Sequence, residues 1–262
     1  MSKIYFFSDK IQENQSLIDG YKEKWESIVK GGIRMNEVNN ELKEYVKNFI
    51  FPIYDKNDAG HGIDHIQYVI RRSIAFAHQF ENIDLDMVYA IASFHDLGHH
   101  IDKDNHEKVS AKLFYENKKM HEFFSEEQRK IIKEAIEDHR ASLDYEPRSN
   151  YGKIISSADR NVEINSSLKR THDYSVKHYP ELDLPQMITR AYNHLYEKFG
   201  NCGYAKMWCY DEEFDNFKKE VAELLQDKYK FAVRYMEVNN IMDIKEKAKL
   251  FAIGAHIEQE KK

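Results

Sequence analysis

Four histidines and three aspartates follow an apolar run in the stretch IASFHDLGHHIDKDNHEK, residues 91–108. Neutral imidazoles and carboxylates are the side chains that bind divalent transition metals. A buried, ionised aspartate is costly unless it is paired or bound to a cation. The stretch therefore predicts a metal site, provided that the surrounding helices carry these groups into the protein interior.

One predicted helix explains how the first two of these groups reach the interior. The apolar periodicity of residues 84–97 predicts a core helix that begins with an aspartate as its N-cap. His95 follows Val88 and Ile91 at spacings of seven and four residues, so it lies on the buried face. Gly98 is expected to end this helix, because glycine readily adopts the left-handed conformation found after many helices. His95 and the aspartate after it are thus predicted in the last turn of a core helix.

Four further predicted helices each place a histidine or an aspartate among inward-facing aliphatic residues. These residues are His65, His106, His139 and Asp159. The helix that carries His139 begins at Ser125, where the pattern S-x-x-Q predicts a capping box. A single inward histidine is more often a hydrogen-bonded core residue than a metal ligand. Five helices that all point such groups inward favour a shared metal site.

Other histidines near these residues are predicted to have supporting roles. His61 lies one turn before His65 and is expected to anchor the loop or to support a ligand. His99 and His100 follow the helix end and are expected to face the solvent or the rim of a pocket. His172 belongs to a second HD dipeptide in a polar setting, so its role is predicted to be structural or incidental.

Composition limits the broad class of the protein. The chain has 262 residues, of which 42% are hydrophobic, so it can form a sizeable core. Its formal net charge is −6 and no run of lysine or arginine stands out, so binding to long nucleic acid is not expected. The two cysteines, Cys202 and Cys209, form no CxxC pair, and a reducing, cytoplasmic location is expected. No apolar run is long enough to predict a signal peptide or a membrane span.

Helix-breaking residues are few, with 4 prolines and 10 glycines, and the pattern predicts an all-α protein. Turn-forming residues collect in FPIYDKNDAGHG, residues 51–62, which are predicted to form a loop. We expect an N-terminal helical extension (1–50), a helical metal-binding core (51–170) and a C-terminal helical region (171–262). The aromatic stripes of the last region predict helices packed on the core. A dimer interface, and hence a homo-oligomer, or a pocket lid are the alternatives.

Three segments of the sequence resemble the HD-domain metal-dependent phosphohydrolase superfamily. They are GHGIDHIQYVIRRS, AIASFHDLGHH and KIISSADRNVEI, which together reproduce the order H…HD…D. The resemblance spans roughly residues 50–170 and implies an all-α helical bundle. It also implies that a divalent cation binds to the matching residues, which are His65, His95, Asp96 and Asp159.

Some branches of this superfamily hold two metal ions and carry two more histidines between the HD dipeptide and the last aspartate. His106 and His139 occupy such places, in agreement with their positions on inward helix faces. They are predicted to bind a second ion, or instead to contact the phosphate or relay protons. Asp96 is a candidate bridging ligand, so Asp96, His106 and His139 are the candidate catalytic residues. A bound metal ion lowers the pKa of water and supplies hydroxide near neutral pH.

The mixed set of imidazoles and carboxylates suits transition metals. Manganese is expected first, and iron, cobalt, nickel, zinc or magnesium are alternatives. The resemblance implies a small phosphorylated substrate, with a nucleotide as the first expectation. Lys103, Arg140 and Arg160 lie beside the proposed ligands in the sequence and are candidates for a phosphate clamp, although each could instead be a surface charge.

Three other functions remain open. Hydrolysis of the alarmone (p)ppGpp is suggested by ADRN around Asp159, but Gly98, His99 and His100 stand where those enzymes carry an acidic pair. A di-iron oxygenase is an alternative, because some relatives with six ligands activate oxygen rather than water. An HD module that binds a ligand without catalysis is the third, and the intact set of ligands argues against it.

Overall fold

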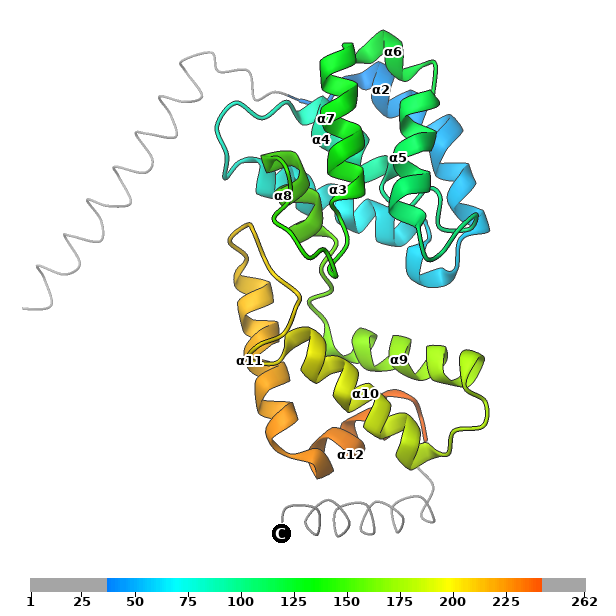
Figure 1. The fold of residues 1–262 in the computed structure, drawn as a ribbon, viewed down its shortest axis with the longest axis vertical. Helices are drawn as coiled ribbons and strands as arrows, with labels where there is room; N and C mark the ends of the chain where they lie inside the picture. The colour runs from blue at the N-terminus through cyan, green and yellow to red at the C-terminus, as the bar shows by residue number, and fades with distance from the viewer. Residues whose placement is uncertain (1–36, 242–262) are drawn as a thin grey trace, which may run out of the picture. The chain divides into compact units, whose positions relative to one another are not determined.

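The structure, a computed structural model, describes residues 37–241, and this part of the chain consists of helices and loops without a β-strand (Figure 1). The all-α class predicted from the sequence is confirmed. The N-terminal segment that was predicted to be helical lies mostly outside the described residues, as do residues 242–262. The buried apolar side chains form two clusters, one from the helices before residue 160 and one from the helices after it.

The first cluster is built around a helix that is buried on all sides. Every residue of α4 from Met87 to Phe94 is buried, which is typical of a helix in the centre of a bundle. Helix α4 packs against α3, α5, α7 and α8, and Figure 1 shows α3, α7 and α8 next to it. The helices of this cluster are α2 (Asn40–Tyr45), α3 (Ile63–Ala77), α4 (Leu85–Phe94), α5 (His106–Glu116), α6 (Met120–Phe123), α7 (Glu126–Glu137) and α8 (Asn150–Ala158).

The predicted helix starts are confirmed by their caps. Asp84 accepts hydrogen bonds from the backbone N–H groups of Asp86 and Met87, so it is the N-cap of α4. Ser125 and Gln128 form the predicted capping box at the start of α7. Each cap of this kind typically contributes about 1 kcal/mol of stability.

The end of α4 differs from the prediction. The helix ends at Phe94, and residues from His95 onward continue as a series of turns. Gly98 does not adopt a left-handed conformation, so the predicted reason for a glycine here is wrong. A Cβ atom at Gly98 would lie 2.6 Å from Val109 Cγ1 and 2.9 Å from the backbone nitrogen of Ser110. The glycine is needed because α5 packs directly on this turn.

Residues 51–62 are more regular than the predicted loop. A π-helical turn (Val46–Ile50) continues α2, and two 3-10 helices follow (Phe51–Lys56 and Ala59–His61). Turn-forming residues favour such short 3-10 turns as well as irregular loops. The side-chain amide of Asn57 donates to the backbone carbonyls of His61 and Asp96, at 3.0 Å each. This asparagine ties the segment to the turn that follows α4.

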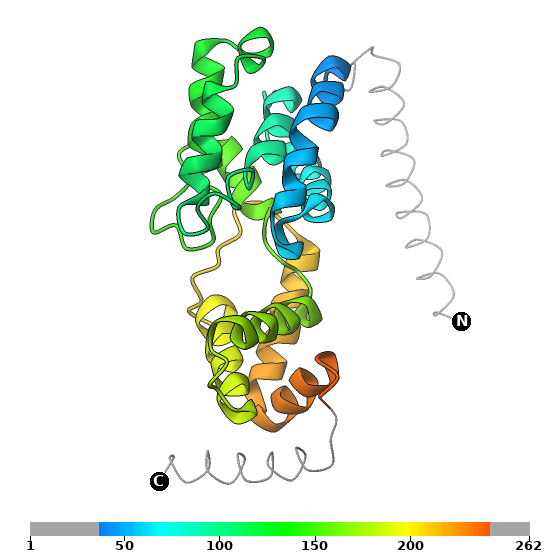
Figure 2. The same ribbon diagram turned by 90° about the vertical axis from the view of Figure 1, so that its right-hand side faces the viewer.

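The second cluster contains the aromatic residues of the C-terminal region. Phe199, Phe214 and Phe217 pack edge-on or tilted against one another, and Phe199 and Phe217 have ring centroids 4.8 Å apart. These residues thus pack on one another in a cluster of their own, while the boundaries at residues 50 and 170 stay predictions. The helices that supply this cluster are α9 (Ile164–His178), α10 (Leu184–Phe199), α11 (Glu212–Gln226) and α12 (Lys228–Val238). In Figure 2 they are coloured from yellow-green to orange.

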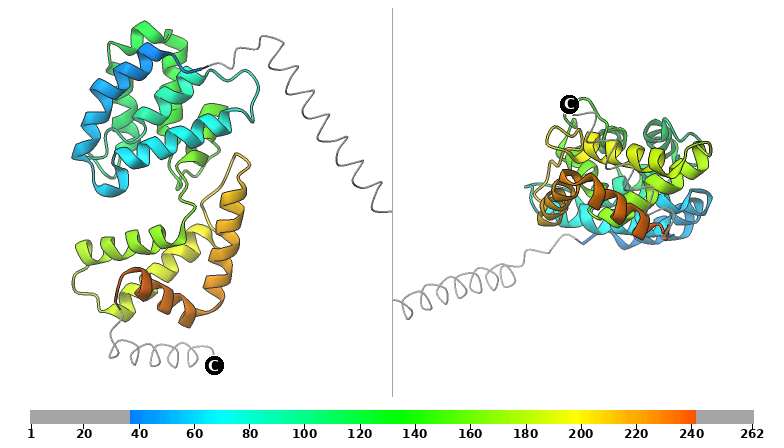
Figure 3. Two further views of the ribbon diagram at one scale, coloured as in Figure 1. Left: turned by 180° about the vertical axis from the view of Figure 1, so that it is seen from behind. Right: turned by 90° about the horizontal axis from the view of Figure 1, so that it is seen from below.

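The segment between α10 and α11 returns to the first cluster (Figure 3). Ser157 Oγ in α8 accepts a hydrogen bond from the backbone N–H of Trp208 at 2.9 Å. Arg72, which is buried in α3, forms ion pairs with Asp211 at 2.5 Å and with Glu213 at 3.3 Å. These contacts join the two clusters. Within residues 37–241, no helix combines the length and the apolar character needed to cross a membrane.

Candidate metal centre

The first group of candidate ligands comes from three different helices. His65 lies in the first turn of α3, His95 directly follows α4, and Asp159 is the C-cap of α8. Asp159 Oδ1 lies 3.1 Å from His65 Nε2 and 3.8 Å from His95 Nε2. One ligand atom from each residue lies within 4.8 Å of the others, so the three side chains can surround a single ion.

The second group lies beside the first and contains Asp96, His106 and His139. His106 begins α5, and His139 lies just after the C-cap of α7. Asp96 Oδ1 is 3.4 Å from the Nε2 atoms of both histidines. Here too one atom from each residue lies within 4.8 Å of the others.

Asp96 connects the two groups through its two carboxylate oxygens. Oδ1 faces the second group, whereas Oδ2 lies 3.6 Å from His65 Nε2 and 3.4 Å from His95 Nε2 of the first group. The side chain is only 3% exposed, so water cannot easily compensate its charge. A carboxylate with one oxygen directed to each group has the arrangement of a bridging ligand.

Three of the histidines are oriented by their own backbone. The Nδ1 atoms of His95, His106 and His139 lie 2.7–2.9 Å from the carbonyl oxygen of the residue three positions earlier in the chain. A carbonyl only accepts hydrogen bonds, so each Nδ1 carries the proton and donates it. Each Nε2 is therefore the nitrogen that faces the centre, and it can bind a metal ion once it carries no proton.

Two buried nitrogens of the two ligand groups have no hydrogen-bond partner among residues 37–241. They are the Nε2 atoms of His65 and His95, although carboxylate oxygens lie close to both. These close approaches do not meet the geometry of hydrogen bonds. Unsatisfied buried polar atoms are rare in native structures. The two nitrogens thus fit a divalent cation, which would bind to all of these atoms at once.

The close carboxylates and imidazoles of the centre shift one another's pKa values. Burial raises the pKa of the Asp96 carboxyl, but the imidazoles of His95, His139 and His65 outweigh burial and hold this pKa well below its usual range. Burial lowers the pKa of His95, but Asp96 and Asp159 together raise it to about 10. Without a cation, the cluster therefore retains protons that a divalent ion would displace.

A third group, made of Asp58, His61 and His99, is less suited to a metal ion. The rings of His61 and His99 are stacked, with centroids 3.8 Å apart and planes 19° apart. A metal ion lies in the plane of each imidazole that binds it, so two nearly parallel rings cannot easily share one. His61 Nδ1 is 2.7 Å from Asp58 Oδ1, and its Nε2 is 3.4 Å from Arg170 Nη2. Both of its nitrogens are thus engaged in a way that anchors the loop.

The remaining histidines complete the comparison with the sequence. His99 is 6% exposed, so the expectation that it faces the solvent is wrong, whereas a place at the rim of the site stays open. His100 is held by Asn57, whose Oδ1 atom lies 3.1 Å from both its backbone nitrogen and its Nδ1. His172 Nδ1 lies 2.9 Å from the hydroxyl of Tyr235 in the second cluster, which agrees with a structural role.

The three residues predicted to form a phosphate clamp differ in burial and in their contacts. Arg140 donates to the carbonyl of Asp104 at 2.5 Å and pairs with Glu107 at 3.2 Å. Lys103 is exposed and lies over the ring of Tyr174.

Arg160 is the buried member of this set, at 3% exposure. Its Nη2 donates to Ser156 at 2.7 Å and its Nη1 to the carbonyl of His139 at 3.4 Å, while its Nε has no partner. Arg160 thus has a donor to spare, and phosphate binding by all three residues stays a prediction.

Sequence reasoning missed three kinds of residue around the centre. Asn57 fixes the turn after α4, and backbone carbonyls set the ring orientation of three histidines. Arg170 in α9 and Lys198 in α10 also approach the site from the C-terminal region. They carry no signal in the sequence, because charged residues on amphipathic helices normally face the solvent.

Comparison with known proteins agrees with the geometry. Residues 62–161 match the family model described as HD domain, and this range includes all six residues of the two groups. Comparisons with curated proteins and with solved structures gave no match. The resemblance expected from the order H…HD…D is thus confirmed for this part of the chain. Over residues 62–161 the chain therefore matches the HD domain, a helical fold found largely in metal-dependent hydrolases.

Proposed function

We propose that this protein is a metal-dependent phosphohydrolase that acts on a nucleotide or another small phosphate ester or anhydride. The observation that carries the proposal is the position of Asp96, whose two oxygens face two separate groups of ligand atoms. Such a pair of groups suits two divalent cations. When bound, these ions would lower the pKa of a water molecule and neutralise the charge of a phosphate.

Each side chain has a distinct part in this proposal. His65, His95 and Asp159 would hold the first ion and His106 and His139 the second, and Asp96 would contribute to both. The carbonyl acceptors behind three of the imidazoles fix the ring orientation, so little reorganisation is needed when an ion binds. The mixture of nitrogen and oxygen ligands suits manganese, which we propose first, or iron, cobalt, nickel or zinc.

Binding of the substrate phosphate is assigned in the same proposal to Arg160, with Lys103 and Arg140 at the edge of the site. The unpartnered Nε of Arg160 supports this assignment, since an arginine fork matches the oxygens of a phosphate. Cys202 and Cys209 are both free thiols, which suits the reducing cytoplasm proposed for this chain.

The test measures metal content and turnover together. Protein loaded with manganese or cobalt should release phosphate, or cleave an anhydride or diester bond, in a panel of nucleotides and phosphate esters. His95→Ala and Asp96→Ala should lose both the metal and the activity. His172→Ala is the matched control, because it removes the histidine of the other HD dipeptide and should change neither.

Three results would contradict the proposal. Equal metal content in the wild type and in both ligand variants would show that His95 and Asp96 do not bind the metal. Oxygen consumption by the iron form, with no turnover of any phosphate compound, would favour the di-iron oxygenase. A metal-loaded protein that does neither would instead favour a ligand-binding module.

A further inference from the structure

Basic residues from the C-terminal helices lie next to the metal centre. Arg170 in α9 donates from Nη2 to His61 Nε2 at 3.4 Å. Its guanidinium also lies against Gly60, where an added Cβ atom would come within 3.4 Å of Nη2. Lys198, in the last turn of α10, lies close enough to Arg160 and Arg170 for their charges to act on it.

Among the described residues these cations have no carboxylate at ion-pair distance, although Asp159 attracts Arg160 and Lys198 from farther away. No carboxylate oxygen of residues 37–241 lies within 4.0 Å of a charged nitrogen of Arg160, Arg170 or Lys198. Arg160 is buried, and its Nε has no hydrogen-bond partner. Burial, followed by repulsion from Arg160 and Arg170 and partly offset by attraction to Asp159, lowers the pKa of Lys198 to about 8. The fold thus concentrates positive charge at a cost to its own stability.

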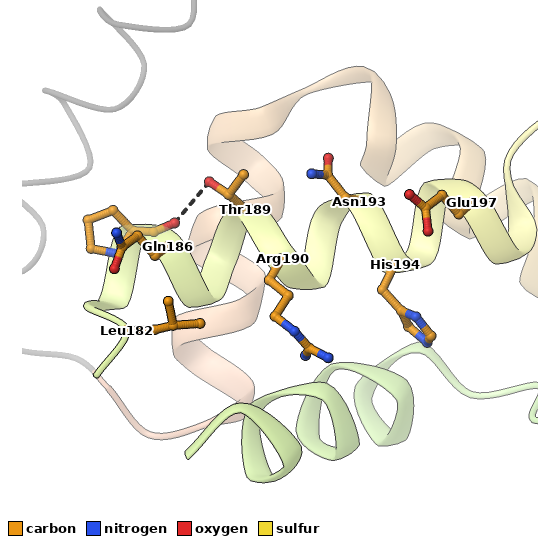
Figure 4. Close-up of a pocket in the computed structure, with 8 residues that line it drawn as sticks. Leu182, Gln186, Thr189, Arg190, Asn193, His194 and Glu197 are labelled. Carbon is orange, nitrogen blue, oxygen red and sulfur yellow. Dashed lines mark hydrogen bonds between the residues drawn. The ribbon is translucent and has the colours of Figure 1, made fainter. Parts of the chain in front are cut away.

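Arg190 and Lys198 add positive charge to one face of α10, on either side of His194, whose pKa of about 4 leaves it neutral at pH 7. Arg190, His194 and Lys198 follow one another at intervals of four residues, so they form a single stripe on the helix. Figure 4 shows that Arg190 and His194 point from α10 toward α9. A groove of about 600 Å³ runs beside them and is also lined by Gln186, Thr189 and Asn193. One carboxylate, that of Glu197, borders the groove.

We infer that Arg160, Arg170 and Lys198 form an anion subsite that binds a second phosphate of the substrate, beyond the phosphate held at the metal centre. Arg160 directly follows Asp159, so the subsite begins beside the first group of ligands. The substrate class is therefore a compound with two or more linked phosphates rather than a monoester. This inference rests on the proposed function for the reaction, but the anion subsite itself does not require a bound metal.

The test measures binding to the full-length chain after removal of metal. Inorganic tripolyphosphate should bind more tightly than orthophosphate in titration calorimetry at constant ionic strength. Lys198→Gln and Arg170→Gln should each weaken tripolyphosphate binding by about tenfold or more, as expected for the loss of a charge-assisted hydrogen bond. Arg170→Lys, which keeps the charge, should retain part of the affinity. Lys219→Gln, at an exposed position of α11, is the control and should bind like the wild type.

A purely structural role gives a different pattern. Because Lys198 sits among other cations, Lys198→Gln should leave the melting temperature unchanged or raise it while the affinity falls. A lower melting temperature with normal tripolyphosphate affinity would overturn the inference. Equal binding of tripolyphosphate and orthophosphate by the wild type would overturn it too.

The outcome is separable from that of the proposed function. Tripolyphosphate binding that depends on Lys198 would support the subsite even in a protein that hydrolyses nothing. In an active enzyme, Lys198→Gln should lower kcat/KM for a nucleoside triphosphate by about tenfold more than for a monophosphate. An equal loss for both substrates would argue against a second phosphate at this position.

Discussion

The Nε2 atoms of His106 and His139 lie 3.0 Å apart, and the Nδ1 atom of each ring donates to a backbone carbonyl. Two neutral imidazoles in this state direct their lone pairs toward each other, which is repulsive. A cation or a shared proton between them would remove the repulsion. The pair is therefore the most informative part of the centre for deciding between one metal ion and two.

Replacement of either histidine by alanine should remove about one metal ion per chain and leave the other bound. Activity should fall sharply, because the nucleophile would lose one of its two activating ions. Elemental analysis and turnover of the same samples measure both effects. Unchanged stoichiometry with a loss of roughly 100- to 10,000-fold in turnover would instead indicate a proton relay or a phosphate contact. A lower melting temperature with a normal rate of turnover would show that both residues only pack in the core.

Metal binding should release protons at neutral pH. The pKa of His95 is raised to about 10 in the metal-free centre, so this imidazole is protonated at pH 7 and must lose its proton to bind an ion. Metal affinity should therefore rise with pH up to about pH 10, a window above the one set by an ordinary histidine. Calorimetry in buffers of different ionisation enthalpy should count about one proton from His95 per chain. A proton count of zero at pH 7 would show that the imidazole is already neutral.

Gly98→Ala should destabilise the protein by about 1–3 kcal/mol, because the new methyl group would overlap Val109 and the backbone of α5. Helix α5 begins at His106, so its displacement should also weaken the second metal site. Ser110→Ala provides the comparison, since it removes only the hydrogen bond from Gly98 N–H and should cost about 1 kcal/mol. Chemical denaturation and metal counting measure both variants. A fully stable Gly98→Ala protein would mean that α5 can shift without cost.

His194 should make the protein less stable in acid. Burial, followed by the charges of Lys198, Arg190 and Arg170, lowers its pKa to about 4, whereas an unfolded histidine titrates near 6.5. The unfolded state therefore takes up a proton first, and stability is lost as the pH falls from about 6.5 to about 4. At pH 5 this loss amounts to about 2 kcal/mol at most.

The measurement compares the free energy of unfolding of His194→Gln and the wild type across this range. The difference between the two proteins should change with pH in favour of the variant below pH 6.5. His178→Gln, at the C-terminal end of α9, controls for the removal of a histidine in general. A constant difference between His194→Gln and the wild type would show that His194 titrates normally.

The sequence allowed prediction of most of the centre because its ligands follow helical periodicity. His95 continues the apolar stripe of α4 although the helix ends at Phe94, because the chain keeps helical dihedral angles for one more residue. Asp159 is similarly the C-cap of α8 rather than a residue within the helix. Periodicity thus identified the inward direction even where the helix boundaries were displaced.

Features that depend on distant parts of the chain could not be predicted in this way. The reason for Gly98 is the approach of α5, which no local pattern encodes. Arg170 reaches His61 across 109 positions of the sequence, and Lys198 meets Arg160 only when α10 is packed. Both basic residues look like ordinary solvent-facing charges until the tertiary structure brings them together.

The metal centre depends on the tautomer of each imidazole and on the distances between the rings. Because backbone carbonyls accept from His95, His106 and His139, the tautomer does not depend on those distances. Each ring receives its tautomer from a residue three positions away, so that choice is made locally, before the helices meet. The distances between rings depend instead on how the helices dock. Damage to the core should therefore spread the ligands apart while every imidazole still offers the correct nitrogen. Such variants would bind metal weakly at low metal concentration. Metal binding would recover at high metal concentration, because each ring still presents its Nε2 atom.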